Sequence, residues 1–154
     1  MKKVRLMTTA ALVAIAGFTT ISLTSCTKDD VVCAVGLEGK NCDQEVREKY
    51  YNTYRGDGVD SWGDTYTNWA VTFSARGTDP TAMKFELLDE TNATLVRADA
   101  NLKTNTTFKI DETTMNNGAT YTGNGTVDEN SASITLKEVH TGITTTYTFN
   151  NLSR

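Results

Sequence analysis

Residues 69–88 read WAVTFSARGTDPTAMKFELL, and their alternation of apolar and polar side chains sets the pattern for the rest of the chain. On both sides of the segment 77–80, apolar side chains occupy every second position: Trp69, Val71, Phe73 and Ala75 before it, and Met83, Phe85 and Leu87 after it. Successive side chains of a strand point to opposite faces, so this period of two predicts two half-buried strands. Gly77, Asp79 and Pro80 are turn residues, and they predict a hairpin between the strands.

The same alternation recurs as far as the C-terminus. Further strands are predicted around 96–102, 108–110, 121–127, 134–136 and 143–149, and one more near 51–56 brings the number to eight. Turn residues separate them, and such short connections favour antiparallel neighbours. Eight sequential strands with one apolar face predict an all-β, up-and-down barrel, because closure removes exposed edges. The alternative is a β-sandwich of two open sheets.

A short helix is predicted ahead of the barrel, at about residues 44–50. Val46, Tyr50 and Tyr54 recur at a spacing of four, which is typical of one apolar helix face. Asp43 is a candidate N-cap, and Glu45 favours the first turn.

The chain begins with the pattern of a secretory signal. Lys2, Lys3 and Arg5 precede an apolar, small-residue core at residues 6–22. A retained transmembrane helix is the alternative, but the apolar run contains four threonines and no basic stop-transfer cluster follows it.

Leu23-Thr24-Ser25-Cys26 resembles the bacterial lipobox, which implies that residues 1–25 are removed and that Cys26 is lipidated. The next residues, Thr27-Lys28-Asp29-Asp30, resemble the surface-export signal of Bacteroidota lipoproteins, with Lys28, Asp29 and Asp30 at its informative positions. These resemblances imply a lipid-anchored protein of the outer membrane that faces the cell exterior. An ordinary secretory signal and a solvated charged tether are the alternatives.

Two cysteines remain once Cys26 is assigned to lipidation. Cys33 and Cys42 are predicted to form a disulfide, because an exported chain meets an oxidising compartment. Two thiols without a neighbouring His or further Cys make a poor metal site. Residues 33–43 resemble the last loop of an EGF-like module without its first four cysteines. We therefore expect a signal peptide at 1–25, a lipidated tether with a stapled loop at 26–43, and a barrel at 44–154.

Residues 39–54 and 74–81 resemble a group of Bacteroidota surface lipoproteins in which an EGF-like end leads into a calycin-like, or lipocalin-like, barrel. The resemblance spans about 33–154 and implies a barrel of that kind. It carries no ligand over to any residue.

Charge and side-chain inventory exclude several functions. Removal of the leader leaves 12 basic and 19 acidic residues, a formal charge of −7, which disfavours nucleic acid as a partner. His140 is the single histidine, and no catalytic set, metal-spaced cluster or phosphate-cradling loop is visible. Asp57, Asp60 and Asp64 could bind calcium, but their spacing is not that of an EF-hand. We expect a protein that is not an enzyme and needs no cofactor.

Aromatic residues are the candidate binding groups. Trp62 lies in a predicted loop at 55–64 and could contact a glycan or a protein. The other candidates belong to the predicted barrel interior: Trp69, Phe73, Phe85, Tyr121 and Tyr147, together with Phe108 and Phe149. Two interpretations remain open. The interior is either hollow and binds a small apolar ligand, or filled, in which case the barrel has a structural or surface-interaction role.

Overall fold

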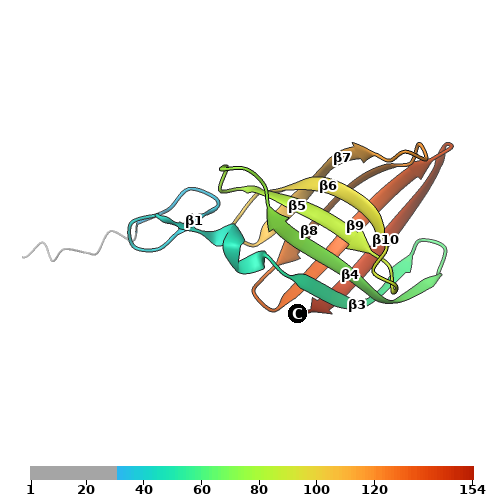
Figure 1. The fold of residues 1–154 in the computed structure, drawn as a ribbon, viewed down its shortest axis with the longest axis horizontal. Coiled ribbons are helices and arrows are strands. Elements are labelled where there is room, and N and C mark those ends of the chain that lie inside the picture. The colour runs from blue at the N-terminus through green and yellow to red at the C-terminus, as the bar shows by residue number, and fades with distance from the viewer. Residues whose placement is uncertain (1–30) are drawn as a thin grey trace, which may run out of the picture. The chain divides into compact units, whose positions relative to one another are not determined.

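The computed structural model describes residues 31–154, in which eight antiparallel strands close into one barrel (Figure 1). The barrel strands are β3 Thr53–Asp60, β4 Thr65–Ala75, β5 Ala82–Leu88, β6 Thr94–Leu102, β7 Thr107–Thr114, β8 Thr120–Val127, β9 Ser131–His140 and β10 Ile143–Ser153. Each strand pairs with its neighbours in sequence, and β10 pairs with β3 to close the ring. The prediction of an all-β, up-and-down barrel is confirmed, and the sandwich is excluded.

A small stapled loop precedes the barrel. Strands β1 Leu37–Glu38 and β2 Gln44–Glu45 pair with each other, and a disulfide joins Cys33 to Cys42 with their Cα atoms 5.3 Å apart. The predicted disulfide is therefore confirmed.

The segment 44–50, predicted as a short helix, forms no α-helix. Gln44 and Glu45 are extended because they pair with β1, and only Val46–Tyr50 coil, as the 3₁₀-helix η1. The N-cap, Glu45, makes no side-chain capping bond.

The prediction of a loop at 55–64 is wrong over its first six residues. Strand β3 continues through Gly56 and Gly58 to Asp60, and only 61–64 form the turn. The glycines are interior strand positions, because Leu152 and Phe149 of β10 lie where their side chains would be. Glycine in a strand often marks such a close approach rather than a loop.

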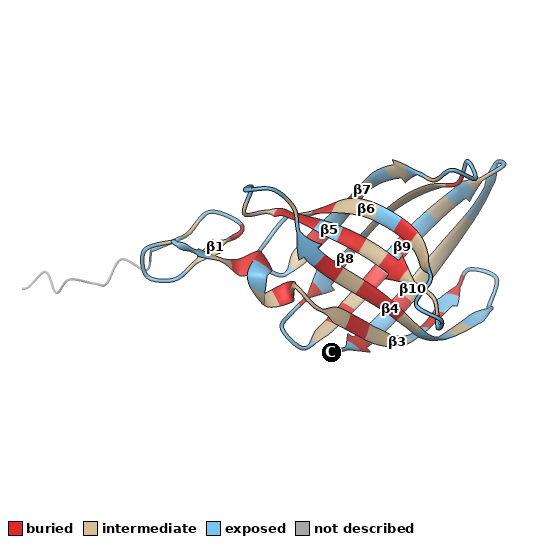
Figure 2. Cartoon of the chain, viewed as in Figure 1, coloured by how far each residue is buried: buried red, intermediate tan, exposed pale blue. Residues whose placement is uncertain are grey.

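The middle of the barrel is filled with side chains. Buried and less buried residues alternate along the strands, as β5 and β9 show (Figure 2). Phe73 lies at the centre, with its ring centroid 5.0 Å from that of Phe108 and 6.0 Å from those of Phe85 and Tyr54. Burying each such ring contributes about 1.5–3 kcal/mol.

The two ends of the barrel differ. One end, here called the plugged end, carries the connections β4–β5, β6–β7 and β8–β9 and is contacted by η1. The other end, the mouth, carries the turns β3–β4, β5–β6, β7–β8 and β9–β10.

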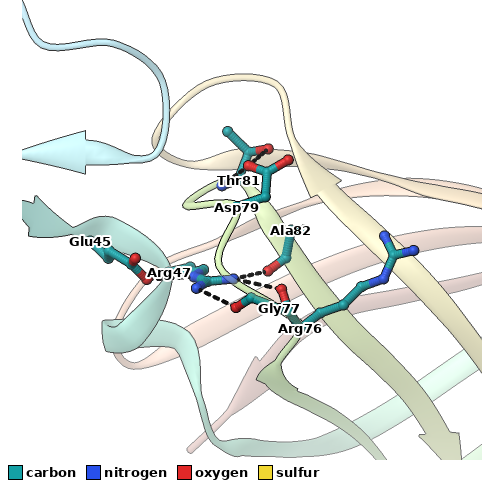
Figure 3. Close-up of polar contacts among 7 residues, drawn as sticks. All are labelled: Glu45, Arg47, Arg76, Gly77, Asp79, Thr81 and Ala82. Atoms are coloured by element: carbon teal, nitrogen blue, oxygen red, sulfur yellow. Dashed lines mark hydrogen bonds and ion pairs between the residues drawn. The ribbon is translucent and has the colours of Figure 1, made fainter.

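Arg47 of η1 is the plug. Its guanidinium donates hydrogen bonds to the main-chain oxygens of Ala82 (2.6 Å), Arg76 (2.9 Å) and Gly77 (3.0 Å), and its Nε pairs with Glu45 at 2.7 Å (Figure 3). The residue is only 4% exposed. A buried charge is tolerated when its donors are satisfied in this way.

The stapled loop also contacts the plugged end. The side-chain amide of Asn105 accepts from the main-chain N–H of Gly36 at 3.0 Å and donates to the main-chain oxygen of Leu37 at 3.3 Å. Gly36 has a φ of +88°, and a Cβ there would lie 2.6 Å from the carbonyl oxygen of Pro80. The loop and the barrel belong to one compact unit, Val32–Arg154.

No helix of residues 31–154 has both the length and the apolar character needed to cross a membrane. The secretory signal, Cys26 and the export residues Lys28, Asp29 and Asp30 lie outside the described residues.

Candidate ligand site at the mouth of the barrel

A cavity of about 300 Å³ opens at the mouth. Strands β4, β5, β6, β8, β9 and β10 and the β7–β8 turn supply its walls, which consist of Trp69, Leu87, Leu95, Val96, Asn117, Tyr121, Glu138 and Tyr147. Trp69 stacks on Phe149 with ring centroids 5.8 Å apart, and Phe149 belongs to the buried core. The cavity is therefore the unfilled end of a barrel whose middle is packed.

Glu138 is the one charged side chain in the wall of the cavity. Its carboxylate accepts a hydrogen bond from Tyr147 Oη at 2.6 Å, and Tyr121 lines the same cavity. Burial and the nearby Glu138 carboxylate raise the pKa of Tyr121 to about 12 and raise that of Tyr147 further. Both tyrosines therefore stay neutral at physiological pH, so the Tyr147 hydroxyl keeps the proton that it donates to Glu138.

A second carboxylate lies beside the cavity, at the end of β3. Asp60 accepts from Tyr66 Oη at 2.7 Å and from the main-chain N–H groups of Trp62 (2.8 Å) and Asp64 (3.1 Å). Burial opposes ionisation of Asp60, but these hydrogen bonds outweigh it and lower its pKa. Burial and Asp60 raise the pKa of Tyr66 to about 12.

An aromatic cluster connects the two carboxylates. The ring centroid of Tyr66 lies 4.5 Å from that of Trp69 and 5.7 Å from that of Tyr147. Trp69 Nε1 in turn donates to Glu90 of the β5–β6 turn at 3.2 Å. Ring contacts and this hydrogen bond thus hold the Trp69 side chain of the cavity wall in place.

The candidate binding residues from the sequence separate into three groups. Trp69, Tyr121 and Tyr147 line the cavity. Phe73 and Phe85 are 1% and 0% exposed in the core and do not line it. Trp62 is 69% exposed on the β3–β4 turn, where its Nε1 donates to Thr145 Oγ1 at 3.2 Å.

Sequence analysis missed Glu138 and Tyr66. Glu138 occupies the next inward-facing position of β9 after Ile134 and Leu136. A charged residue at a position where the alternation predicts an apolar one could have identified it from the sequence. Tyr66 had none, because it lies in a run of polar and threonine residues at the start of β4.

Two of the three aspartates considered for calcium stabilise the first hairpin with their carboxylates, and Asp64 takes part only through its main chain. Asp57 Oδ1 accepts from the main-chain N–H of Asn68 at 2.9 Å, and Asp60 accepts from the turn as described above. Among residues 31–154, no three His, Cys, Asp or Glu side chains are grouped so that they could hold a metal ion. His140 ends β9, and its side chain makes no hydrogen bond or ion pair within this part of the chain.

No protein-family model, curated protein or solved structure matches this chain. The geometry of the mouth and the sequence patterns therefore carry the functional argument.

Proposed function

We propose that this chain is a non-enzymatic lipoprotein, anchored at the cell surface through Cys26, whose barrel binds a small ligand in the mouth cavity. The anchor and the location depend on the resemblance of residues 23–30 to a lipobox followed by an export signal. Several acyl chains on Cys26 would hold the protein at the membrane for practical purposes permanently.

The cavity supports the binding role. Ligand sites are concave, mostly apolar and supplied with a few convergent polar groups, and they range from about 300 to 1,000 Å³. The mouth cavity has aliphatic walls from Leu87, Leu95 and Val96, aromatic walls, and one carboxylate. At about 300 Å³ it suits a small molecule rather than a long lipid.

The stapled loop lies at the end of the barrel opposite to the cavity, which agrees with this role. The stapled loop that follows the tether contacts the plugged end through Gly36 and Asn105. The mouth is the end of the barrel opposite to these contacts. Its turns and its cavity remain accessible to solutes.

A structural or surface-interaction role is the second candidate. Trp62 favours it, because a 69% exposed indole on the rim of the mouth could contact a glycan or a protein.

A native mass spectrum of the full-length lipoprotein, extracted gently in detergent from its own source, tests the proposal. We expect the acyl mass on Cys26 and, in addition, a discrete non-covalent mass that denaturation removes. Leu95→Trp should abolish the second mass by filling the cavity, whereas Val139→Trp on the outer face of β9 should retain it. Protein without the non-covalent mass in every sample would favour the surface-interaction role.

The anchor has its own test. Cys26→Ser should remove the acyl mass and release the protein from the membrane fraction, and Cys33→Ser should leave both unchanged. Acylated Cys26→Ser protein would contradict the anchor.

A further inference from the structure

We infer that the mouth cavity binds a small organic cation with an apolar body, such as an aryl-alkyl amine. The inference rests on the proposed binding role and names the class of its ligand. Glu138 would pair with the cationic group, and the aromatic and aliphatic walls would cover the apolar body.

Within residues 31–154, the Glu138 carboxylate forms no ion pair. The ion pairs of residues 31–154 involve Arg47, Lys49, Arg76 and Arg97, and none of them includes Glu138. A carboxylate has about four acceptor positions, and the hydroxyl of Tyr147 fills one of those of Glu138. Acceptor capacity therefore remains for a donor that carries a positive charge, and such a hydrogen bond is about twice as strong as a neutral one.

The aromatic walls favour a cation as well. The aromatic side chains of Trp69, Tyr121 and Tyr147 line the same cavity as Glu138. Aromatic faces attract ammonium groups that lie within about 6 Å of the ring centre. Because the indole of Trp69 is fixed by Glu90 and by its stacking on Phe149, binding requires little reordering of this wall.

The charges around the mouth disfavour the other ligand classes. An anion would meet the Glu138 carboxylate in the cavity wall. Asp60 and Glu90, which accept hydrogen bonds from Tyr66 and Trp69, add negative charge nearby. A neutral apolar ligand would cover Glu138 without compensating its charge, which costs free energy. A cation removes both penalties, and the negative potential also speeds its approach.

Three probes of nearly equal shape test the inference: 4-fluorophenethylamine, 2-(4-fluorophenyl)ethanol and 4-fluorophenylacetate. Each is titrated into the full-length lipoprotein in detergent and followed by ¹⁹F NMR, with empty micelles as the blank. We expect the amine to bind at least about tenfold more tightly than the alcohol, and the carboxylate to show no binding. Leu95→Trp should abolish binding of the amine.

Glu138→Gln is the matched variant. We expect it to weaken amine binding at least about tenfold, to leave the alcohol unchanged, and so to remove the preference. Glu129→Gln, in the β8–β9 connection at the plugged end, should behave like the wild type. Glu138→Asp keeps the charge and should retain part of the preference.

Two outcomes overturn the inference. If the alcohol or the carboxylate binds as tightly as the amine and Leu95→Trp blocks it, the cavity binds ligands without choosing cations, and the proposed function survives. If no probe binds the wild type, the inference is again wrong, and the native mass spectrum decides the proposed function separately. The ranking of the three probes on the wild type needs no variant. The inference can therefore be tested even if Glu138→Gln folds poorly.

Discussion

The guanidinium of Arg47 lies 2.6 Å from the main-chain oxygen of Ala82, thirty-five positions along the chain (Figure 3). This bond joins η1 to the first residue of β5 and, with the bonds to Arg76 and Gly77, gives the β4–β5 connection one shared donor group. The guanidinium group of Arg47 therefore closes the plugged end by donating to three main-chain carbonyl oxygens.

Replacing Arg47 with methionine should lower the free energy of unfolding by about 2–4 kcal/mol, because three carbonyl groups lose a charged donor at a buried position. Urea unfolding followed by tryptophan fluorescence measures the loss. Arg97→Met is the control, since the Arg97 side chain is 70% exposed and its ion pair with Glu86 contributes less than about 1 kcal/mol. Equal losses for the two variants would mean that Arg47 is not a structural plug.

Two neighbouring tyrosines should respond differently to loss of their hydroxyls. Tyr51 Oη is buried and has no hydrogen-bond partner among the described residues, so Tyr51→Phe should leave stability unchanged or raise it by up to about 1 kcal/mol. Tyr54 Oη donates to the main-chain oxygen of Asp128 at 2.9 Å, so Tyr54→Phe should cost about 1–2 kcal/mol. Chemical denaturation measures the free energy of unfolding of both variants. An equal loss of stability for Tyr51→Phe and Tyr54→Phe would show that the Tyr51 hydroxyl forms a hydrogen bond after all.

Gly58 should not accept a side chain. A Cβ there would overlap Cδ1 and Cε1 of the Phe149 ring, and such overpacking costs about 1–3 kcal/mol. We expect Gly58→Ala to lower the melting temperature. Combining Gly58→Ala with Phe149→Leu should destabilise the barrel less than the sum of the two single changes. Strict additivity in this double-mutant cycle would show that the ring does not limit position 58.

Four aspartates should make stability depend on acid pH. Hydrogen bonds lower the pKa of Asp79 (from Thr81), Asp89 (from Thr91) and Asp128 (from Asn130 and Ser131), and that of Asp60 as described. A carboxyl whose pKa is lower in the folded state stabilises the fold above its unfolded pKa, about 3.9, and this contribution is lost as the pH falls through the folded pKa.

The melting temperature should therefore fall as the pH drops from about 5 toward 2. An Asp89→Asn variant should show a shallower fall, because asparagine can still accept from the main-chain N–H groups of Thr91 and Ala93 but does not titrate. A melting temperature independent of pH over this range would contradict the lowered pKa values.

Much of the barrel could be predicted from the sequence because its strands carry a period of two and its turns carry turn residues. Phe73 and Phe85 show the limit of that signal. Their alternation predicts that they point inward, and it does not distinguish a packed core from a cavity wall. Trp69 has the same alternation, yet it lines the cavity.

The first hairpin shows a second limit. The glycines at 56 and 58 favoured a loop in the sequence, and the side chains of Leu152 and Phe149 explain why these positions are strand. Because β10 and β3 are joined only by closure of the ring, this contact is nearly a hundred positions away in sequence. Local patterns could not reveal it.

The sequence alone specifies the all-β class and the order of eight hairpin-connected strands, because alternation and turn chemistry are local properties. The tertiary structure alone decided that Arg47 closes one end, that the middle is filled, and that Glu138 meets Trp69, Tyr121 and Tyr147 at the other end. These relationships arise when the ring closes, since closure sets which side chains from distant strands share one layer of the interior.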